Sequence, residues 1–306
     1  MNGEAPCPLI LDCDPGADDA LAILLALASP ELAVQAITVA GGNAPVSRTL
    51  ANARGLVALA GKETPVHAGT DRALLGFFPP GWEGHGPDGL AGVKLPPGPP
   101  AAPGLAADAI RAALRRASAP LTLVGIAPAT NLALALATEP ALAASVAEIV
   151  LMAGACGTGN ATPEAEFNAL ADPEALTILA AAGPALTLVP LEAGRAVRAS
   201  PIRIAKLAKA GSGRALQTAI AILRALPSPE AGPALYDPLA LAWLIRPALF
   251  RARPVSLAVE RGPGPARGRT IITASPPGRG LAIRLIEPCD PDGLFALLAE
   301  RLARLP

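Results

Sequence analysis

Four aspartates crowd into eight residues near the start of the chain. The segment LDCDPGADDA (11–20) carries them as Asp12, Asp14, Asp18 and Asp19. Alternation along an extended strand predicts that the first two share a face, and the last two follow a Pro-Gly turn at the start of a helical stretch. Helix capping explains one or two such acids. Four together would repel one another unless a cation lay among them, and an oxygen-only ligand set favours Ca²⁺ or Mg²⁺.

Zinc and disulfide chemistry find little support. The chain has two histidines, His67 and His85, and neither has a partner at zinc-ligand spacing. We expect His67, in the probable short strand PVHAG, to be structural. The four cysteines match no metal or redox pattern, and we expect them to be reduced thiols: Cys7, Cys13, Cys156 and Cys289.

A polar, glycine-rich segment, 154–172, follows an apolar run and contains Asn160, Glu166 and Asn168. Each of these side chains, taken alone, is more often a turn or helix cap than a ligand contact. Three of them on one loop, after a strand that ends near the acidic cluster, favour a binding role.

Short apolar runs alternate with Ala/Leu-rich helical stretches, which predicts a parallel sheet with helices on both faces. We expect strands at 8–11, 33–40, 120–127, 147–154, 184–191, 255–260, 269–274 and 282–287, and helices at 19–28, 46–60, 105–117, 129–137 and 173–182. The fold class is therefore α/β: one domain over 1–306 with a mostly parallel, doubly wound, Rossmann-like sheet. Ligands of such sheets bind at the carboxyl ends of the strands. The Gly/Pro-rich stretch 76–104 is long enough to predict a functional loop.

Composition narrows the partners. The formal net charge is zero, so nothing predicts a nucleic-acid or acidic-membrane partner. The most apolar run, 20–28, is far shorter than a membrane span, and the first residues lack the basic start and apolar core of a signal peptide. We therefore expect a cytoplasmic protein.

Four segments together resemble the inosine-uridine preferring nucleoside hydrolase family. They are DCDPGADDALAILLA at the start, AITVAGGN (36–43), EIVLMAG with GNATPEAEFNALADPEA (148–175), and YDPLALA (236–242). The resemblance runs from residue 9 to about 250. It implies the nucleoside hydrolase fold, hydrolysis of the N-glycosidic bond of a ribonucleoside to ribose and free base, a role in nucleoside salvage, and a homodimer or homotetramer.

The resemblance also implies roles for individual residues. The Ca²⁺ ligands would be the side chains of Asp14, Asp19 and Asp237 and the main-chain carbonyl of Ile126. Asp14 would also be the general base that activates a calcium-bound water. The other expected contacts are with the nucleoside or its water: Asp18 and Asn168 with the ribose 2′- and 3′-hydroxyls, Asn160 and Glu166 with the 5′-hydroxyl, Asn43 beside the metal and water, and Met152 in the wall of the sugar pocket. Asp237, before Pro238, could equally be a plain helix N-cap.

The chain departs from the family pattern where the leaving base is protonated. Many members have His at the position of Tyr236, and an HxHG segment where this chain has Glu83-Gly84-His85-Gly86. Tyrosine, with an ordinary pKa near 10, is a weaker acid than imidazolium. Tyr236, His85 or Glu83 could assist the base, or it could stack on an aromatic side chain of the 76–104 loop, for which simple loop packing is an equal explanation: Trp82, Phe77 or Phe78.

Two other functions remain open from the sequence. A haloacid-dehalogenase-like phosphatase also ends a strand in Asp-x-Asp, but it has Thr or Val where this chain has Gly16. A catalytically weak ribose- or nucleoside-binding protein with a retained calcium site would explain the missing imidazoles.

Overall fold

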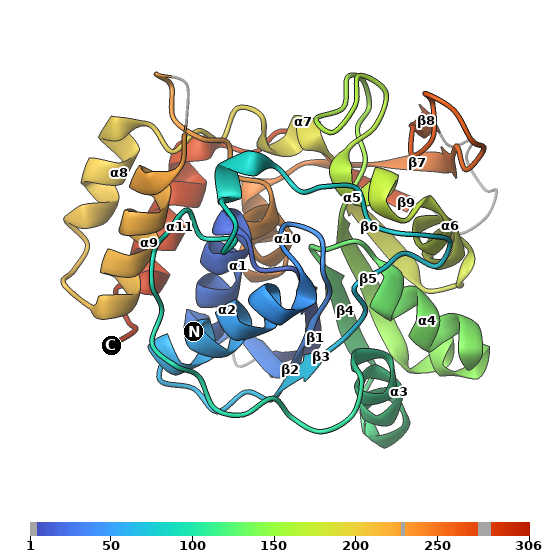
Figure 1. The fold of residues 1–306 in the computed structure, drawn as a ribbon, viewed down its shortest axis with the longest axis horizontal. Coiled ribbons are helices and arrows are strands. Elements are labelled where there is room, and N and C mark those ends of the chain that lie inside the picture. Colours follow the sequence, from blue (N-terminus) through green and yellow to red (C-terminus); the bar gives the residue numbers. More distant parts are fainter. Residues whose placement is uncertain (1–4, 228–229, 275–282) are drawn as a thin grey trace.

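One nine-stranded sheet organises the molecule (Figure 1). The computed structural model describes residues 5–227, 230–274 and 283–306. The strand order is β3-β2-β1-β4-β5-β6-β9-β7-β8, in which the first six strands and β9 run parallel and β7 is antiparallel to both of its neighbours. The strands are β1 (Cys7–Cys13), β2 (Leu32–Val39), β3 (Val66–Ala68), β4 (Leu121–Gly125), β5 (Val146–Met152), β6 (Ala185–Val189), β7 (Ala252–Val259), β8 (Thr270–Ala274) and β9 (Ile283–Ile286).

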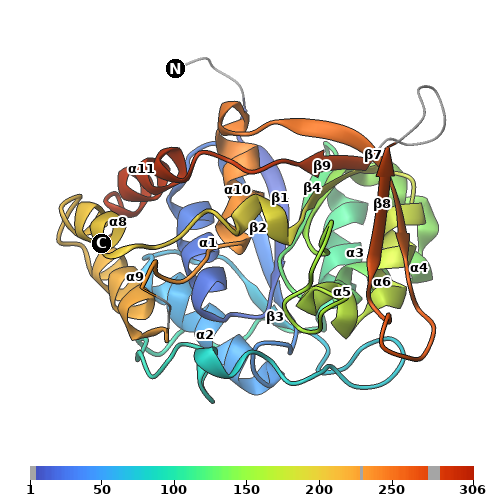
Figure 2. The same ribbon diagram turned by 90° about the horizontal axis from the view of Figure 1, so that it is seen from above.

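Helices cover both faces of the sheet and form two separate apolar cores. One core contains α1 (Ala17–Ala28), α2 (Val46–Leu59), α8 (Pro201–Ala208), α9 (Arg214–Ala225), α10 (Asp237–Ile245) and α11 (Pro291–Leu302). The other contains α3 (Ala106–Arg116), α4 (Thr130–Thr138) and α6 (Pro173–Ala181). Figure 2 shows the two groups of helices on opposite sides of the strands. The doubly wound, mostly parallel α/β fold is thereby confirmed.

The remaining helices are short and lie in loops. They are α5 (Phe167–Ala171), α7 (Leu191–Gly194) and the 3-10 helices η1 (Glu83–His85), η2 (Pro140–Ser145) and η3 (Pro247–Leu249). Within the long loop 76–104, η1 is the helical turn that carries His85. No helix in the described ranges is both long and apolar enough to cross a membrane.

Helix α1 is the central helix of the fold. Its sequence, ADDALAILLALA, is apolar on every side after the first turn, as expected of a helix that is buried all round. It packs between α2, α9, α10 and α11. Asp18 is half-buried in the first turn, whereas Asp19 is fully buried. The helix therefore begins with carboxylates at the edge of the sheet and continues as core.

The strand and helix predictions agree with the structure to within about three residues, and residue 282 of the last predicted strand lies outside the described residues. His67 lies in β3, and its Nδ1 is 3.1 Å from the carbonyl oxygen of Pro103, a contact that suits the structural role expected for it. The register pairs Asp12 with Gly125, and Gly125 with Leu151. The segments that follow β1, β4 and β5 therefore leave the sheet together at one edge.

Candidate active site

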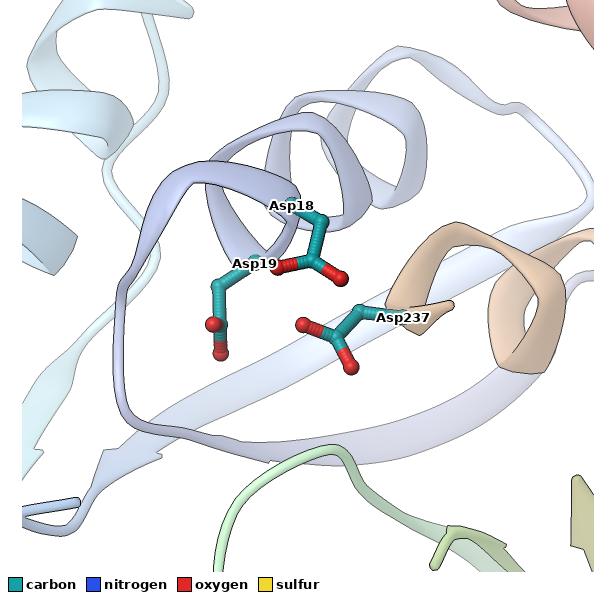
Figure 3. Close-up of side chains that lie close together, drawn as sticks. All are labelled: Asp18, Asp19 and Asp237. Atoms are coloured by element: carbon teal, nitrogen blue, oxygen red, sulfur yellow. The ribbon is translucent and has the colours of Figure 1, made fainter. Parts of the chain in front are cut away.

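Three carboxylates meet at the carboxyl edge of the sheet. Asp18, Asp19 and Asp237 each offer an oxygen within 4.8 Å of the others (Figure 3). The first two lie in the first turn of α1, and Asp237 begins α10. Free N–H groups at the two helix starts partly offset the mutual repulsion of the acids. This oxygen-only cluster could hold a metal ion.

Asp19 is the most tightly held member of the cluster. Its Oδ1 accepts the N–H of Asp14 at 3.1 Å, and its Oδ2 accepts the N–H of Gly16 at 3.0 Å and Nδ2 of Asn43 at 3.0 Å. Burial, reinforced by the charge of Asp18, raises the pKa of Asp19 to about 7. These hydrogen bonds orient the Asp19 carboxylate for a positively charged ligand. Without such a ligand, ionisation of the buried carboxyl group is unfavourable.

Asp14 follows β1 and is 1% exposed. Its Oδ2 accepts the N–H of Asn43 at 2.7 Å, while its buried Oδ1 has no hydrogen-bond partner among the described residues. Burial and the nearby charge of Asp19 raise its pKa well above the usual range. An unpartnered carboxylate oxygen beside three further carboxylates suits a cation.

The backbone at Gly42 approaches Asp14 closely. A Cβ at this position would lie 2.1 Å from Oδ2 of Asp14, and the φ angle of Gly42 is +154°. Only glycine combines this approach with this backbone angle. The AGGN segment therefore encloses the Asp14 carboxylate and presents Asn43 to it.

Asp237 lies in the cluster and does not cap a helix. The N-cap position of α10 is Tyr236, which makes no side-chain capping bond, and Asp237 points toward Asp18 and Asp19 (Figure 3). Burial and the charges of those two acids raise its pKa well above the usual range. The N-cap of α1 is likewise Gly16, so capping does not explain Asp18.

Asp12, which the sequence pattern groups with Asp14, is fully buried within β1. Its Oδ1 accepts hydrogen bonds from Thr38 Oγ1 at 2.6 Å and Asn131 Nδ2 at 2.9 Å, and its Oδ2 has no hydrogen-bond partner among the described residues. The strand ends at Cys13, so strand alternation does not extend to Asp14. Asp12 ties β1 to β2 and α4 beneath the site.

A cavity of about 710 Å³ opens above the cluster, a size suited to a small-molecule substrate. Most of the side chains that the sequence predicted for the site line it, together with the expected backbone-donor residue. They are Asp18, Asn43, Trp82, Glu83, His85, Ile126, Met152, Asn160, Glu166, Asn168, Tyr236 and Asp237. Asp14 and Asp19 lie buried at its base, in contact with Asn43.

The polar loop before α5 is held by its own side chains. Glu166 caps α5: its Oε1 accepts the N–H of Asn168 at 2.8 Å, and its Oε2 accepts those of Gly154 at 2.7 Å and Ala169 at 2.9 Å. Burial raises the pKa of Glu166 to about 7. Asn160 Oδ1 accepts the N–H of Phe167 at 2.9 Å. The side chains of Asn160 and Glu166 therefore accept N–H groups at the start of α5, as capping predicts, and both residues also line the cavity.

Asn168 connects this loop to the neighbouring strands. Its Nδ2 donates to the carbonyl oxygens of Met152 at 3.0 Å and Ile126 at 3.2 Å. The Ile126 carbonyl is the one that the family resemblance assigns to the metal. Asn168 is thus positioned between the sugar loop and the predicted ligand shell.

His85 is held against the start of α1. Its Nδ1 accepts the N–H of Ala17 at 3.2 Å, which places the ring hydrogen of the neutral imidazole on Nε2. Burial lowers its pKa. The indole of Trp82 meets the imidazole edge to face, with ring centroids 5.2 Å apart.

Of the three aromatic side chains predicted as stacking partners, Trp82 alone lines the cavity. Phe77 is 80% exposed and lies beside the guanidinium of Arg72, and Phe78 does not line the cavity either. Of the three alternatives, stacking on Trp82 therefore stays the prediction that the cavity supports. Phe167 also lines the cavity. Its position within the family-like segment NATPEAEFN could have indicated it as a site residue from the sequence.

Tyr236 and Arg198 also line the cavity. The N–H of Tyr236 donates to Asp18 Oδ2 at 3.3 Å. Burial, followed by the charge of Asp18, raises the pKa of the phenol, while Arg198 opposes the rise. Sequence reasoning missed Arg198 and four apolar residues that line the cavity, because they belong to no motif. The four are Leu226, Pro227, Pro233 and Ala234.

Fold and site together are those of an α/β protein in which an acidic cluster that could hold a metal ion lies beneath a cavity suited to a small molecule. The family model for inosine-uridine preferring nucleoside hydrolases matches residues 9–296. The chain therefore belongs to the inosine-uridine preferring nucleoside hydrolase family, whose members act on N-glycosyl bonds of ribonucleosides. Neither the phosphatase nor the binding-only alternative is supported.

Individual relatives agree on the class of enzyme but differ in base. The chain is 36% identical to a pyrimidine-specific ribonucleoside hydrolase, RihA, of Salmonella agona (strain SL483), covering 96% of this chain and 98% of the relative. It resembles a purine-preferring ribonucleoside hydrolase from Gardnerella vaginalis (28% identity, TM-score 0.86, covering 97% of this chain and 98% of the other). It also resembles an inosine-guanosine nucleoside hydrolase (26% identity, TM-score 0.89, covering 98% and 99%).

Proposed function

We propose that this chain hydrolyses ribonucleosides at the described cavity, with a calcium ion held by Asp14, Asp19, Asp237 and the carbonyl of Ile126. The unpartnered, buried Oδ1 of Asp14 is the observation that carries the proposal. Hard oxygen donors and the absence of sulfur or imidazole from this ligand set favour Ca²⁺. When bound, calcium would orient water and ribose hydroxyls and lower the pKa of the water.

The side chains then divide the work between sugar and water. Asp14 accepts a proton from the attacking water, and Asn43 keeps its carboxylate in place through the bond to Oδ2. Asp18 and Asn168 bind the ribose 2′- and 3′-hydroxyls. Asn160 and Glu166 bind the 5′-hydroxyl, and Met152 forms the wall beside the sugar. The acids also stabilise the positive charge that develops on the ribose.

The departing base meets Tyr236, His85 and Trp82. With Nδ1 occupied by Ala17, His85 has Nε2–H available as a hydrogen-bond donor. Tyr236 also lines the cavity, and its hydroxyl can donate a hydrogen bond to the base. Trp82 offers a ring face on which the base can stack. Because the relatives differ in base, the family alone does not fix the preference of this chain.

A base-release assay tests this proposal. Uridine, inosine, adenosine, guanosine and cytidine would each be incubated with the calcium-loaded and the chelated protein. We expect release of at least one base with calcium and its loss after chelation. No release from any of the five by protein with bound calcium would contradict the proposal.

The family resemblance also suggests a cellular role and an assembly for this chain. We propose nucleoside salvage in the cytoplasm by a homodimer or homotetramer. Sedimentation of the purified chain tests the assembly, and a monomeric species at working concentration would contradict it.

A further inference from the structure

Arg198 is the one arginine or lysine among the described residues that line the cavity. It is half-buried, and its side chain hydrogen-bonds only to backbone carbonyls in the described part of the chain. Surface arginines of this protein commonly pair with carboxylates, as Arg203 does with Asp292. A cation without a carboxylate partner, in a cavity that also contains four acids, indicates a ligand group that carries negative charge: the acids are Asp18, Glu83, Glu166 and Asp237.

The backbone around Arg198 is fixed. Arg198 pairs with Ala234 in an antiparallel bridge, in which the N–H of Ala199 donates to Pro233 at 2.8 Å and the N–H of Leu235 donates to Val197 at 2.9 Å. Tyr236 follows two residues after Ala234. The bridge therefore sets the position of Arg198 relative to Tyr236, and both line the cavity.

The guanidinium itself is oriented from one side. Its Nε donates to the carbonyl of Arg195 at 3.1 Å, and Nη1 donates to the carbonyl of Gly232 at 3.3 Å. Nη2 makes no hydrogen bond to the described residues. The group is thus held in place with donor capacity left over, which is the arrangement expected of a preorganised electrostatic contact.

Apolar residues line the same cavity as Arg198: Pro233 and Ala234, which the bridge places beside it, and also Leu226 and Pro227. We assign this apolar surface to the flat base, because the ribose hydroxyls have their proposed partners among Asp18, Asn160, Glu166 and Asn168. A base bound beside Pro233 and Ala234 would direct a ring substituent toward the guanidinium. A carbonyl oxygen would accept its hydrogen bond, whereas an exocyclic amine would oppose donor to donor.

We propose that Arg198 binds a carbonyl oxygen of the departing base, when that base is uracil or a 6-oxopurine, and stabilises the negative charge that forms on it. This inference rests on the proposed ribonucleoside hydrolysis. The C1′–N bond breaks with both electrons moving to the base nitrogen, and the water oxygen bonds to C1′. Asp14 takes one proton from the water and returns it to solvent. The base anion, paired with Arg198, takes up one proton from solvent, so the products are ribose and neutral base.

Substitutions at Arg198 test the proposal against a matched control. Arg198→Met removes the charge and keeps much of the aliphatic length. Arg198→Lys keeps the charge but replaces the planar guanidinium, with its several fixed N–H donors, by a single ammonium group. Arg195→Met removes a neighbouring charge that does not line the cavity and pairs with Glu192. The substrates would be uridine, inosine, adenosine and p-nitrophenyl β-D-riboside, whose leaving group is already a stable anion in water.

We expect Arg198→Met to lower kcat/KM for uridine and inosine by about 100-fold or more, as loss of one oxyanion donor does elsewhere. The loss for adenosine and the p-nitrophenyl riboside should be less than about tenfold, calcium affinity should be unchanged, and added guanidinium ion should restore part of the uridine activity. Arg198→Lys should lie between, and Arg195→Met should match the wild type.

Equal losses on all four substrates would overturn the proposal, since a merely structural role predicts them. Wild-type rates in Arg198→Met would overturn it as well. Absence of base release by the wild-type protein would instead refute the proposed hydrolysis on which the inference rests.

Discussion

Asp14→Asn separates the structural cost of the acidic cluster from its proposed function. Asparagine has nearly the same shape and can still accept the N–H of Asn43 that now binds Oδ2. It removes the charge of a carboxylate whose pKa burial raises well above the usual range. We therefore expect the variant to lose calcium binding and base release while its metal-free form becomes more stable.

The size of the effect depends on how far burial raises the pKa of Asp14. Each pKa unit of that rise corresponds to about 1.4 kcal/mol against the ionised form. The new amide N–H₂ would take the place of the unpartnered Oδ1 and cost about 1 kcal/mol if it also stays unpaired. The variant is therefore expected to be the more stable form at high pH, and each kcal/mol of gain raises Tm by about 2 °C for a protein of this size.

The gain in stability of Asp14→Asn over the wild type must increase as the pH rises. The unfolded chain ionises Asp14 above about pH 4, whereas the folded, metal-free protein keeps it protonated until its raised pKa is reached. The wild type is therefore penalised progressively as pH rises, and the variant is not. The Tm difference should be near zero at about pH 4 and should increase as the pH rises above that value.

Thermal unfolding in chelator at a series of pH values measures this difference. Asp108→Asn, which removes an exposed carboxylate paired with Arg111 on α3, is the control and should show no comparable trend. Addition of calcium should raise the Tm of the wild type and leave Asp14→Asn unchanged. Destabilisation of the metal-free variant at every pH, or a normal calcium response, would refute the reasoning.

Three further predictions follow from the same geometry. The calcium-induced rise in Tm should be larger at about pH 8 than at about pH 5, because protons compete for carboxylates whose pKa values are raised; an equal rise in differential scanning calorimetry would place the ion elsewhere. Gly42→Ala should lower kcat by about 100-fold or more while the chain stays folded by circular dichroism, because its Cβ would displace the Asp14 carboxylate; near-normal turnover would contradict that approach. Asn168→Ala should raise KM for ribonucleosides by about tenfold, about the worth of one hydrogen bond, and leave the calcium Kd within about threefold; a large loss in calcium titration would show that its bond to Ile126 maintains the ligand shell.

The fold was largely predictable because the strands are continuous apolar runs and the helices are rich in Ala and Leu. Periodicity located β1 and α1 within a few residues, and the contiguous motif placed Asp14, Asp18 and Asp19 near one another. Asp12 shows the limit of that argument, because alternation holds only while the strand continues and β1 ends at Cys13.

Residues from distant segments required more than local pattern. The family resemblance, and not spacing, indicated Ile126 and Asp237, which the topology brings to the same cavity. Arg198 had no motif to mark it, since a bridge to Ala234 positions it and that pairing spans a long stretch of chain. Phe77 and Phe78 were candidates by residue type alone, and neither is among the residues that line the cavity.

The most direct test of the account is to restore calcium to the chelated wild-type enzyme while both bound ion and base release from uridine and inosine are measured. We predict no turnover without calcium and a rise in turnover that parallels the binding of one ion per chain. Full turnover in chelator, or calcium binding without any effect on turnover, would contradict the claim that these carboxylates form a catalytic calcium centre.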